Sequence, residues 1–66
     1  MMIDDLAGNV KKFAEACYDM NSIDELEQSL TLQDADKTDC EEWSINSEEW
    51  LLAIKAALNE KKLNAC

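Results

Sequence analysis

Apolar residues recur at steps of three and four positions through the first third of the chain. The stripe consists of Ile3, Leu6, Ala7, Val10, Phe13, Ala14 and Cys17. Because an α-helix turns once every 3.6 residues, this spacing places all of them on one face. The pattern predicts a helix over residues 3–20 that turns its apolar face toward a core.

A capping signal marks the start of a second helix. Ser22 and Glu25 have the S-x-x-E spacing, in which each side chain accepts a hydrogen bond from the backbone N–H of the other residue. The pattern predicts a helix over residues 23–30 with its leucines facing inward. Residues 30–33 leave two possibilities open, because so short a run fits either a last helical turn or a brief strand.

The polar stretch 33–39 is the predicted loop between the two halves of the chain. Thr38 and Glu41 repeat the capping spacing shortly afterwards. We therefore expect a short third helix over residues 39–44.

The last predicted helix covers residues 47–62, and Asn46 is its expected N-cap. Ile45 before the cap and Trp50 in the first turn have the spacing of a hydrophobic staple. The inner stripe comprises Trp50, Leu51, Ile54, Ala57 and Leu58. The lysine pair that closes the helix suits the negative end of its dipole.

Composition supports an all-helical protein. The 66-residue chain has one glycine and no proline, the residues that most often form tight turns. A chain of this length forms a single domain, here residues 1–66, and builds only a thin core. The predicted fold is an all-α compact bundle of three or four short helices. A short strand near residues 30–33 would make the fold α+β, which is the alternative.

The acidic residues are concentrated in the centre of the chain. Twelve of the fifteen lie between Glu15 and Glu49, where Lys37 is the sole basic residue, and the whole chain has a formal net charge of −9. A field of this sign repels nucleic acid and anionic membranes and attracts basic protein surfaces. The expected partner is therefore a basic protein surface.

The sequence contains no recognisable catalytic or metal-binding pattern. It has no histidine to serve as a general base or a zinc ligand, and no C-x-x-C pair. Cys17 lies on the apolar stripe, Cys40 stands among acidic residues that disfavour a thiolate, and Cys66 is terminal. We expect a protein that is not an enzyme and holds neither cofactor nor metal. The role of the three cysteines is left open.

The N-terminal region has neither a secretory nor a membrane-spanning pattern. Asp4 and Asp5 stand where a signal peptide carries basic residues. No apolar run reaches the roughly 18 residues that a membrane helix requires. The expected location is the cytoplasm.

Acidic side chains on a helix can imitate the backbone of nucleic acid. Carboxylates four positions apart, such as Glu15 and Asp19, stand about 5–6 Å from each other, which is similar to the spacing of neighbouring phosphates. A surface of this kind can occupy a lysine- and arginine-lined channel that normally neutralises phosphates. The predicted partner-binding residues are Glu15, Asp19, Asp24, Glu25, Glu27, Asp34, Asp36, Asp39, Glu41, Glu42, Glu48 and Glu49, with Trp43 as an apolar anchor.

In size, acidity and lack of catalytic residues the chain resembles the small phage-encoded inhibitors of bacterial defence, namely anti-CRISPR and anti-restriction DNA mimics. The resemblance is one of composition and centres on the acidic run from Asp34 to Glu49. It implies a non-enzymatic inhibitor that binds a nuclease or surveillance complex in the host cytoplasm where DNA would bind. It assigns no role to any single residue.

Two other classes remain open at this point. A regulatory adaptor or oligomerisation module would bind through an apolar helix face and use its acids only for solubility. A carrier protein would be modified on Ser29, whose Gln-Ser-Leu context resembles the attachment motif of acyl carrier proteins.

Overall fold

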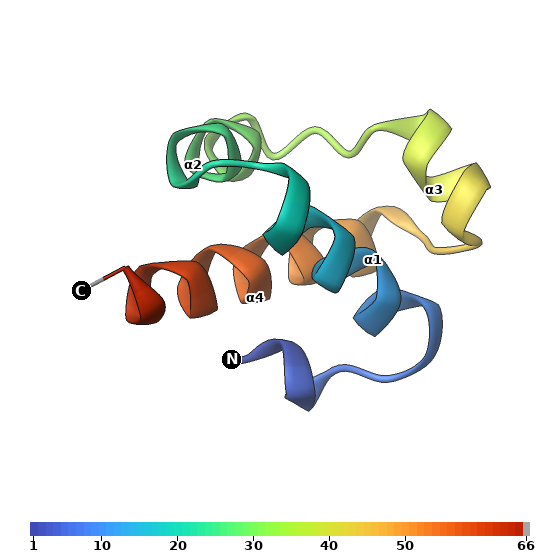
Figure 1. Ribbon diagram of the computed structural model, residues 1–66. Coiled ribbons are helices and arrows are strands. Elements are labelled where there is room, and N and C mark those ends of the chain that lie inside the picture. The colour runs from blue at the N-terminus through green and yellow to red at the C-terminus, as the bar shows by residue number, and fades with distance from the viewer. Residues whose placement is uncertain (66) are drawn as a thin grey trace.

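A computed structural model describes residues 1–65, which form four α-helices and one 3-10 helix (Figure 1). In chain order these are η1 (Ile3–Asp5), α1 (Gly8–Met20), α2 (Ile23–Leu32), α3 (Lys37–Trp43) and α4 (Ser47–Asn64). The prediction of an all-α bundle is confirmed. The alternative with a strand near residues 30–33 is wrong, because residues 30–32 form the last turn of α2 and no strand occurs within residues 1–65.

The longest helix, α4, is the element on which the others assemble. Helices α1 and α2 both pack on α4, α3 contacts α1 and α4, and η1 lies against the same two helices. Figure 1 shows α4 running along the lower part of the molecule, with α2 above one end and α3 above the other. The connection between α2 and α3, residues 33–36, runs along the upper side of the molecule in this view.

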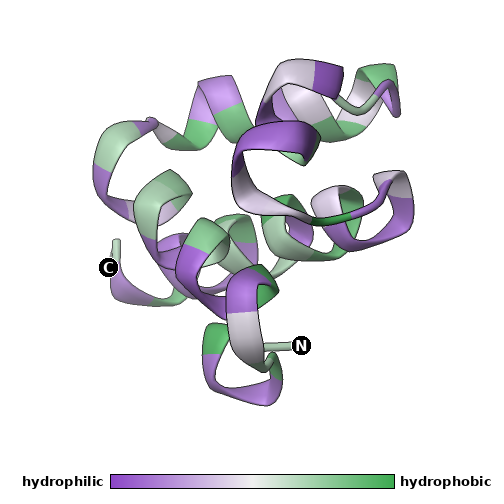
Figure 2. Cartoon of the chain, turned by 90° about the vertical axis from the view of Figure 1, so that its right-hand side faces the viewer, coloured by the Kyte–Doolittle hydropathy of each residue, from purple (hydrophilic) through white to green (hydrophobic). Residues whose placement is uncertain are grey.

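The core is built from the stripes that the sequence predicts, with additional small residues. Phe13, Leu26, Trp50 and Ile54 are all buried. Four alanines on α1 and α4 have no exposed surface, which permits close packing of helices: Ala14, Ala53, Ala56 and Ala57. Hydrophobic and hydrophilic residues alternate along each helix in Figure 2, as amphipathic helices require.

The predicted first helix is interrupted, so the expectation of one helix over residues 3–20 is wrong. The chain forms η1, straightens at Leu6 and Ala7, and starts α1 at Gly8, whose φ of +61° is left-handed. Ile3 and Val10 are nevertheless both buried. The break lets η1 fold back against the side of α1 and α4, a tertiary contact that local periodicity does not encode.

Substitutions at left-handed positions are expected to change stability with opposite signs. Gly8→Ala places a β-carbon on a residue with φ of +61° and should lower the free energy of unfolding by about 1 kcal/mol. No atom lies within 4 Å of that β-carbon position, so the whole effect is conformational. Gln33→Gly, at φ of +50° after α2, should raise stability by about 0.5–1 kcal/mol. Urea unfolding of both variants checks the account, and shifts of the same sign would contradict it.

Helix α2 starts as predicted and ends later. The Ser22 hydroxyl accepts from the Glu25 backbone N–H at 3.2 Å, and the Glu25 carboxylate accepts from the Ser22 N–H at 2.9 Å. The reciprocal cap confirms the capping box. The helix continues to Leu32 and ends at Gln33 in a left-handed conformation.

Helix α3 begins earlier than the sequence pattern predicts, and its cap is a different residue. The Asp36 carboxylate accepts a hydrogen bond from the Thr38 backbone N–H at 2.8 Å, so Asp36 is the N-cap of Lys37–Trp43. The expected cap at Thr38 is therefore wrong, and so is the range 39–44. An aspartate two positions earlier offers the better acceptor and accepts from the N–H of Thr38, the second residue of the helix.

Helix α4 starts at the predicted cap and runs two residues longer than predicted. The Asn46 side chain accepts from the Glu49 N–H at 2.8 Å, and Glu49 accepts from the Asn46 N–H at 2.9 Å. Ile45 and Trp50 are both buried in the core, as the predicted hydrophobic staple requires. Asn64 is the last helical residue, and Cys66 lies outside the described residues.

Candidate partner-binding surface

Several of the predicted contact acids form hydrogen bonds or an ion pair within the fold. Glu25, Asp36 and Glu49 accept backbone N–H bonds at helix starts. Glu27 pairs with Lys62 across α2 and α4 at 3.7 Å. Both members of this pair are about half exposed, so the pair contributes little to stability. These acids contribute negative charge to the surface, but they are also structural, which makes them poor positions for testing binding.

Asp39 links the acidic region to the core. Its carboxylate accepts a hydrogen bond from the indole N–H of the buried Trp50 at 3.3 Å. Burial, followed by the neighbouring charge of Asp39, raises the pKa of the Cys17 thiol to about 12. Burial and the neighbouring acids, Asp39 first among them, also raise the pKa of Cys40. Both thiols are therefore held in the protonated form near neutral pH, which disfavours nucleophilic chemistry.

The other predicted acids make no hydrogen bond or ion pair within residues 1–65. They are Glu15, Asp19, Asp24, Asp34, Glu41, Glu42 and Glu48, all of them exposed. Three of the six lysines interact with other groups: Lys11 lies 3.8 Å from Asp4, Lys62 lies 3.7 Å from Glu27, and Lys61 donates to backbone carbonyls. The seven carboxylates are therefore open to contact with a partner.

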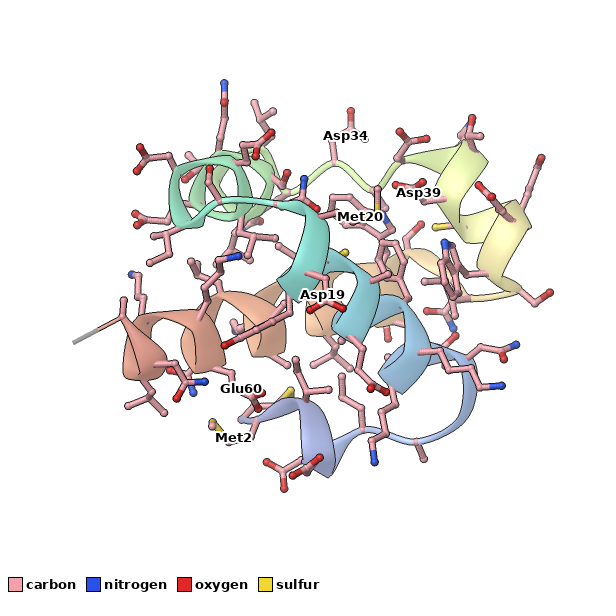
Figure 3. The ribbon with its side chains drawn as sticks, in the orientation of Figure 1. Met2, Asp19, Met20, Asp34, Asp39 and Glu60 are labelled. Atoms are coloured by element: carbon pink, nitrogen blue, oxygen red, sulfur yellow. The ribbon has the colours of Figure 1, made fainter. Side chains whose placement is uncertain are left out.

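Two groups of acids form around the second half of α1. One shallow hollow brings Asp19 at the end of α1 together with Asp24 and Glu25 at the start of α2. On another side of α1, Glu15 and Asp19 share a hollow with Glu60 of α4. Asp19 belongs to both, and Figure 3 shows its side chain near the middle of the face that the view presents.

A third group lies between α1 and α3. Here Asp39 and Glu42 line a groove whose apolar residues include Phe13, Met20 and Trp43. Trp43 is half-buried and its ring centroid lies 5.6 Å from that of Phe13, in a tilted arrangement. The predicted apolar anchor is therefore partly fixed by the core and partly open to the groove.

The remaining predicted acids are not gathered with these groups. Glu48 lies in a different groove, between α2 and α4, with Leu30, Leu52 and Lys55. Asp34 lies on the connection between α2 and α3, and Glu41 lies on α3, and both are exposed. The acids thus spread over four helices and a loop and do not form one row.

The sequence analysis missed several residues of this surface. Asp4 and Glu60 join Glu15 and Asp19 in one hollow, although the two ends of the chain supply them. No local pattern reveals such a pairing. Met20 was also missed, and its position three residues after Cys17 on the apolar stripe was the available signal.

Within residues 1–65, no group of three or more cysteine, aspartate and glutamate side chains is placed to hold a metal ion. None of the helices there combines the length and apolar character that crossing a membrane requires. No protein-family model, curated protein or solved structure matches the chain. The function must therefore be argued from the surface itself.

Proposed function

We propose that the protein is a non-enzymatic acidic inhibitor that binds a basic, nucleic-acid-binding surface of a protein complex and blocks DNA from it. The observation that supports this proposal is the set of exposed carboxylates that pair with no lysine, distributed over the four α-helices and the connection before α3. A partner that normally binds phosphates carries the lysines and arginines that such carboxylates attract. The resemblance to anti-CRISPR and anti-restriction DNA mimics points in the same direction.

A rigid scaffold makes this charge effective. Helices α2 and α4 are fixed by reciprocal caps, so the acids near their starts are held in place rather than being carried on a flexible tail. Because the backbone of a helix is already ordered, binding through these acids costs little backbone freedom. Complementary charge also speeds the encounter with a basic partner and makes the rate depend on ionic strength.

Capture of the partner by charge variants tests the proposal. The variant Glu41→Gln/Glu42→Gln removes two acids that make no internal contact. The control Asn9→Lys/Leu63→Lys changes the net charge by the same amount outside the acidic region. Both immobilised proteins are exposed to a bacterial lysate at low salt, and bound proteins are identified by mass spectrometry.

We expect wild type and control to retain a DNA- or RNA-handling complex, and the double glutamine variant to retain about tenfold less of it, because neutralising charges at an interface slows association. Equal retention by the two variants would show that the acidic surface does not make the contact. A set of retained proteins without any nucleic-acid-handling complex would contradict the proposal as well.

A regulatory adaptor is the second candidate, and one apolar groove favours it. Leu30 of α2 and Leu51 and Leu52 of α4 line a groove of about 370 Å³. Leu32, at the end of α2, is 69% exposed. A partner bound there would be held by apolar contacts, which salt does not screen, so retention that is unchanged at high salt would favour the adaptor.

A further inference from the structure

We infer that the groove between α1 and α3 receives a basic amphipathic helix of the partner, with the helix's apolar side chains between Met20 and Trp43 and its lysines or arginines against Asp39 and Glu42. The inference rests on the proposed function, since it assumes a basic protein partner. It adds a specific binding site to what would otherwise be attraction by overall charge.

The groove has the dimensions of a side-chain site. It encloses about 390 Å³ between the second half of α1 and the whole of α3. Phe13 and Cys17 are buried beneath it, and Trp43 packs against Phe13 in a tilted arrangement at one wall. A volume of this order accommodates apolar side chains of a partner but lies at the small end of the range for drug-sized ligands.

Met20 is the second reason for assigning an apolar contact here. It is 81% exposed, the most exposed of the large hydrophobic residues in the described part of the chain. It stands at the last position of α1 and lines both this groove and the adjoining hollow. Methionine is flexible and polarisable, and both methionine and tryptophan are enriched at protein interfaces. A partner that covers Met20 and Trp43 removes from water the apolar surface that the fold leaves there.

The acidic residues around the groove determine which kind of partner helix fits it. The charged residues that line the groove are both acidic, Asp39 and Glu42. Beyond Met20, the adjoining hollow adds Asp19 and Asp24, and in the view of Figure 3 Met20 lies between Asp19 and Asp39. An occupant therefore needs an apolar stripe with cations on both sides. An amphipathic helix with apolar residues at i and i+4 and flanking lysines or arginines presents this pattern.

The lysine in the adjoining hollow does not cancel this complementarity. Lys61 lines the adjoining hollow, but its ammonium group donates to the carbonyls of Tyr18 and Asn21 at 2.6 and 2.7 Å. The groove between α2 and α4 differs, because it carries Lys55 as well as Glu48 and so does not select a basic occupant. A second copy of this chain is also a poor occupant, since each copy has a net charge of −9 and the two would repel each other.

Titration with defined peptides, followed through the methionine methyl groups, tests the inference. The chain has three methionines, Met1, Met2 and Met20, so selective ¹³C labelling of their methyls gives one signal in the groove and two internal controls away from it. The probe is a lysine-rich amphipathic peptide about four helical turns long, with leucines at i and i+4. The control peptide keeps every lysine and replaces the leucines with serine.

We expect the leucine peptide at low salt to shift the Met20 methyl signal saturably and to leave Met1 and Met2 unchanged. The serine peptide should bind more weakly and leave Met20 in place. If both peptides bind equally and Met20 does not move, the groove inference is wrong while the acidic-surface proposal stands. If neither peptide binds at low salt, the acidic surface does not attract basic segments, and both fail.

Two variants distinguish binding in the groove from binding to any exposed apolar side chain. Met20→Ser should weaken binding of the leucine peptide about tenfold, because central apolar contacts dominate interfaces. Leu63→Ser removes a residue that is 61% exposed near the end of α4 and should leave binding unchanged. Equal weakening by the two substitutions would overturn the assignment, as would a concentration-dependent shift of Met20 without any peptide, which would indicate self-association.

Discussion

Replacing Leu26 with alanine is expected to lower the free energy of unfolding by about 3 kcal/mol, because the substitution removes a buried side chain and leaves a cavity. Leu26 is 1% exposed and is the buried residue through which α2 joins the core. A protein of this size has a total stability of only several kcal/mol, of order 0.1 kcal/mol per residue. The midpoint of thermal unfolding should therefore fall by about 12–24 °C.

Leu32→Ala is the matched control for this prediction. It removes the same atoms from the same helix, but Leu32 is 69% exposed. Its effect should stay within about 0.5 kcal/mol. Thermal unfolding followed by circular dichroism compares the two variants, and an equal loss of stability in both would show that α2 does not bury Leu26 against α4.

Replacing Lys61 with methionine is expected to destabilise the protein by about 2 kcal/mol. The ammonium group of Lys61 reaches from α4 to the carbonyls of Tyr18 and Asn21, where α1 ends. It also lies 5.2 Å from the centre of the Tyr18 ring. Hydrogen bonds to a charged group are worth about 1.5–3 kcal/mol, and a cation favours the negative end of a helix. The substitution leaves those carbonyls without this donor.

Lys62→Met provides a control with the same change of net charge. It removes the Lys62–Glu27 pair, which is about half exposed at both ends and should contribute at most about 0.5 kcal/mol. Urea unfolding should therefore separate the two neighbouring substitutions clearly. Similar losses would mean that Lys61 acts only as one more positive charge on an acidic protein.

The role of Lys61 is an example of a tertiary contact that the sequence does not predict. The sequence places it in the last turn of α4, where a positive charge suits that helix's own dipole. In the structure it serves the end of α1 instead, which is more than forty positions earlier in the chain. A dipole argument is local and identifies the residue type that a helix end prefers. It cannot identify which helix end lies near that residue after folding.

The starts of α2 and α4 followed from the sequence because the capping side chain and the backbone N–H lie three positions apart. The caps at Ser22 and Asn46 are local in this sense, and both were predicted correctly. The break before Gly8 was not, because periodicity continues through it and the fold-back of η1 depends on distant residues. At α3, two local caps competed, and Asp36 rather than Thr38 prevailed.

The candidate surface was predictable in composition but not in arrangement. The acidic pool could be identified because most charged side chains remain at the surface of any fold. The grouping of Asp39 and Glu42 with Met20 depends on how α3 packs against α1, which no spacing along the chain specifies. Only the structure shows which acids cap helices and which remain unpaired.

The central claim is that this acidic surface occupies a site where nucleic acid binds, and displacement by DNA tests it most directly. The immobilised protein is loaded with its captured partner complex at low salt and then challenged with short duplex DNA, with a neutral polymer as control. The account predicts that DNA releases the partner in proportion to its concentration, and that raising the salt concentration does the same, because both compete for the same cations. A partner that stays bound at high salt and in excess DNA would contradict the account.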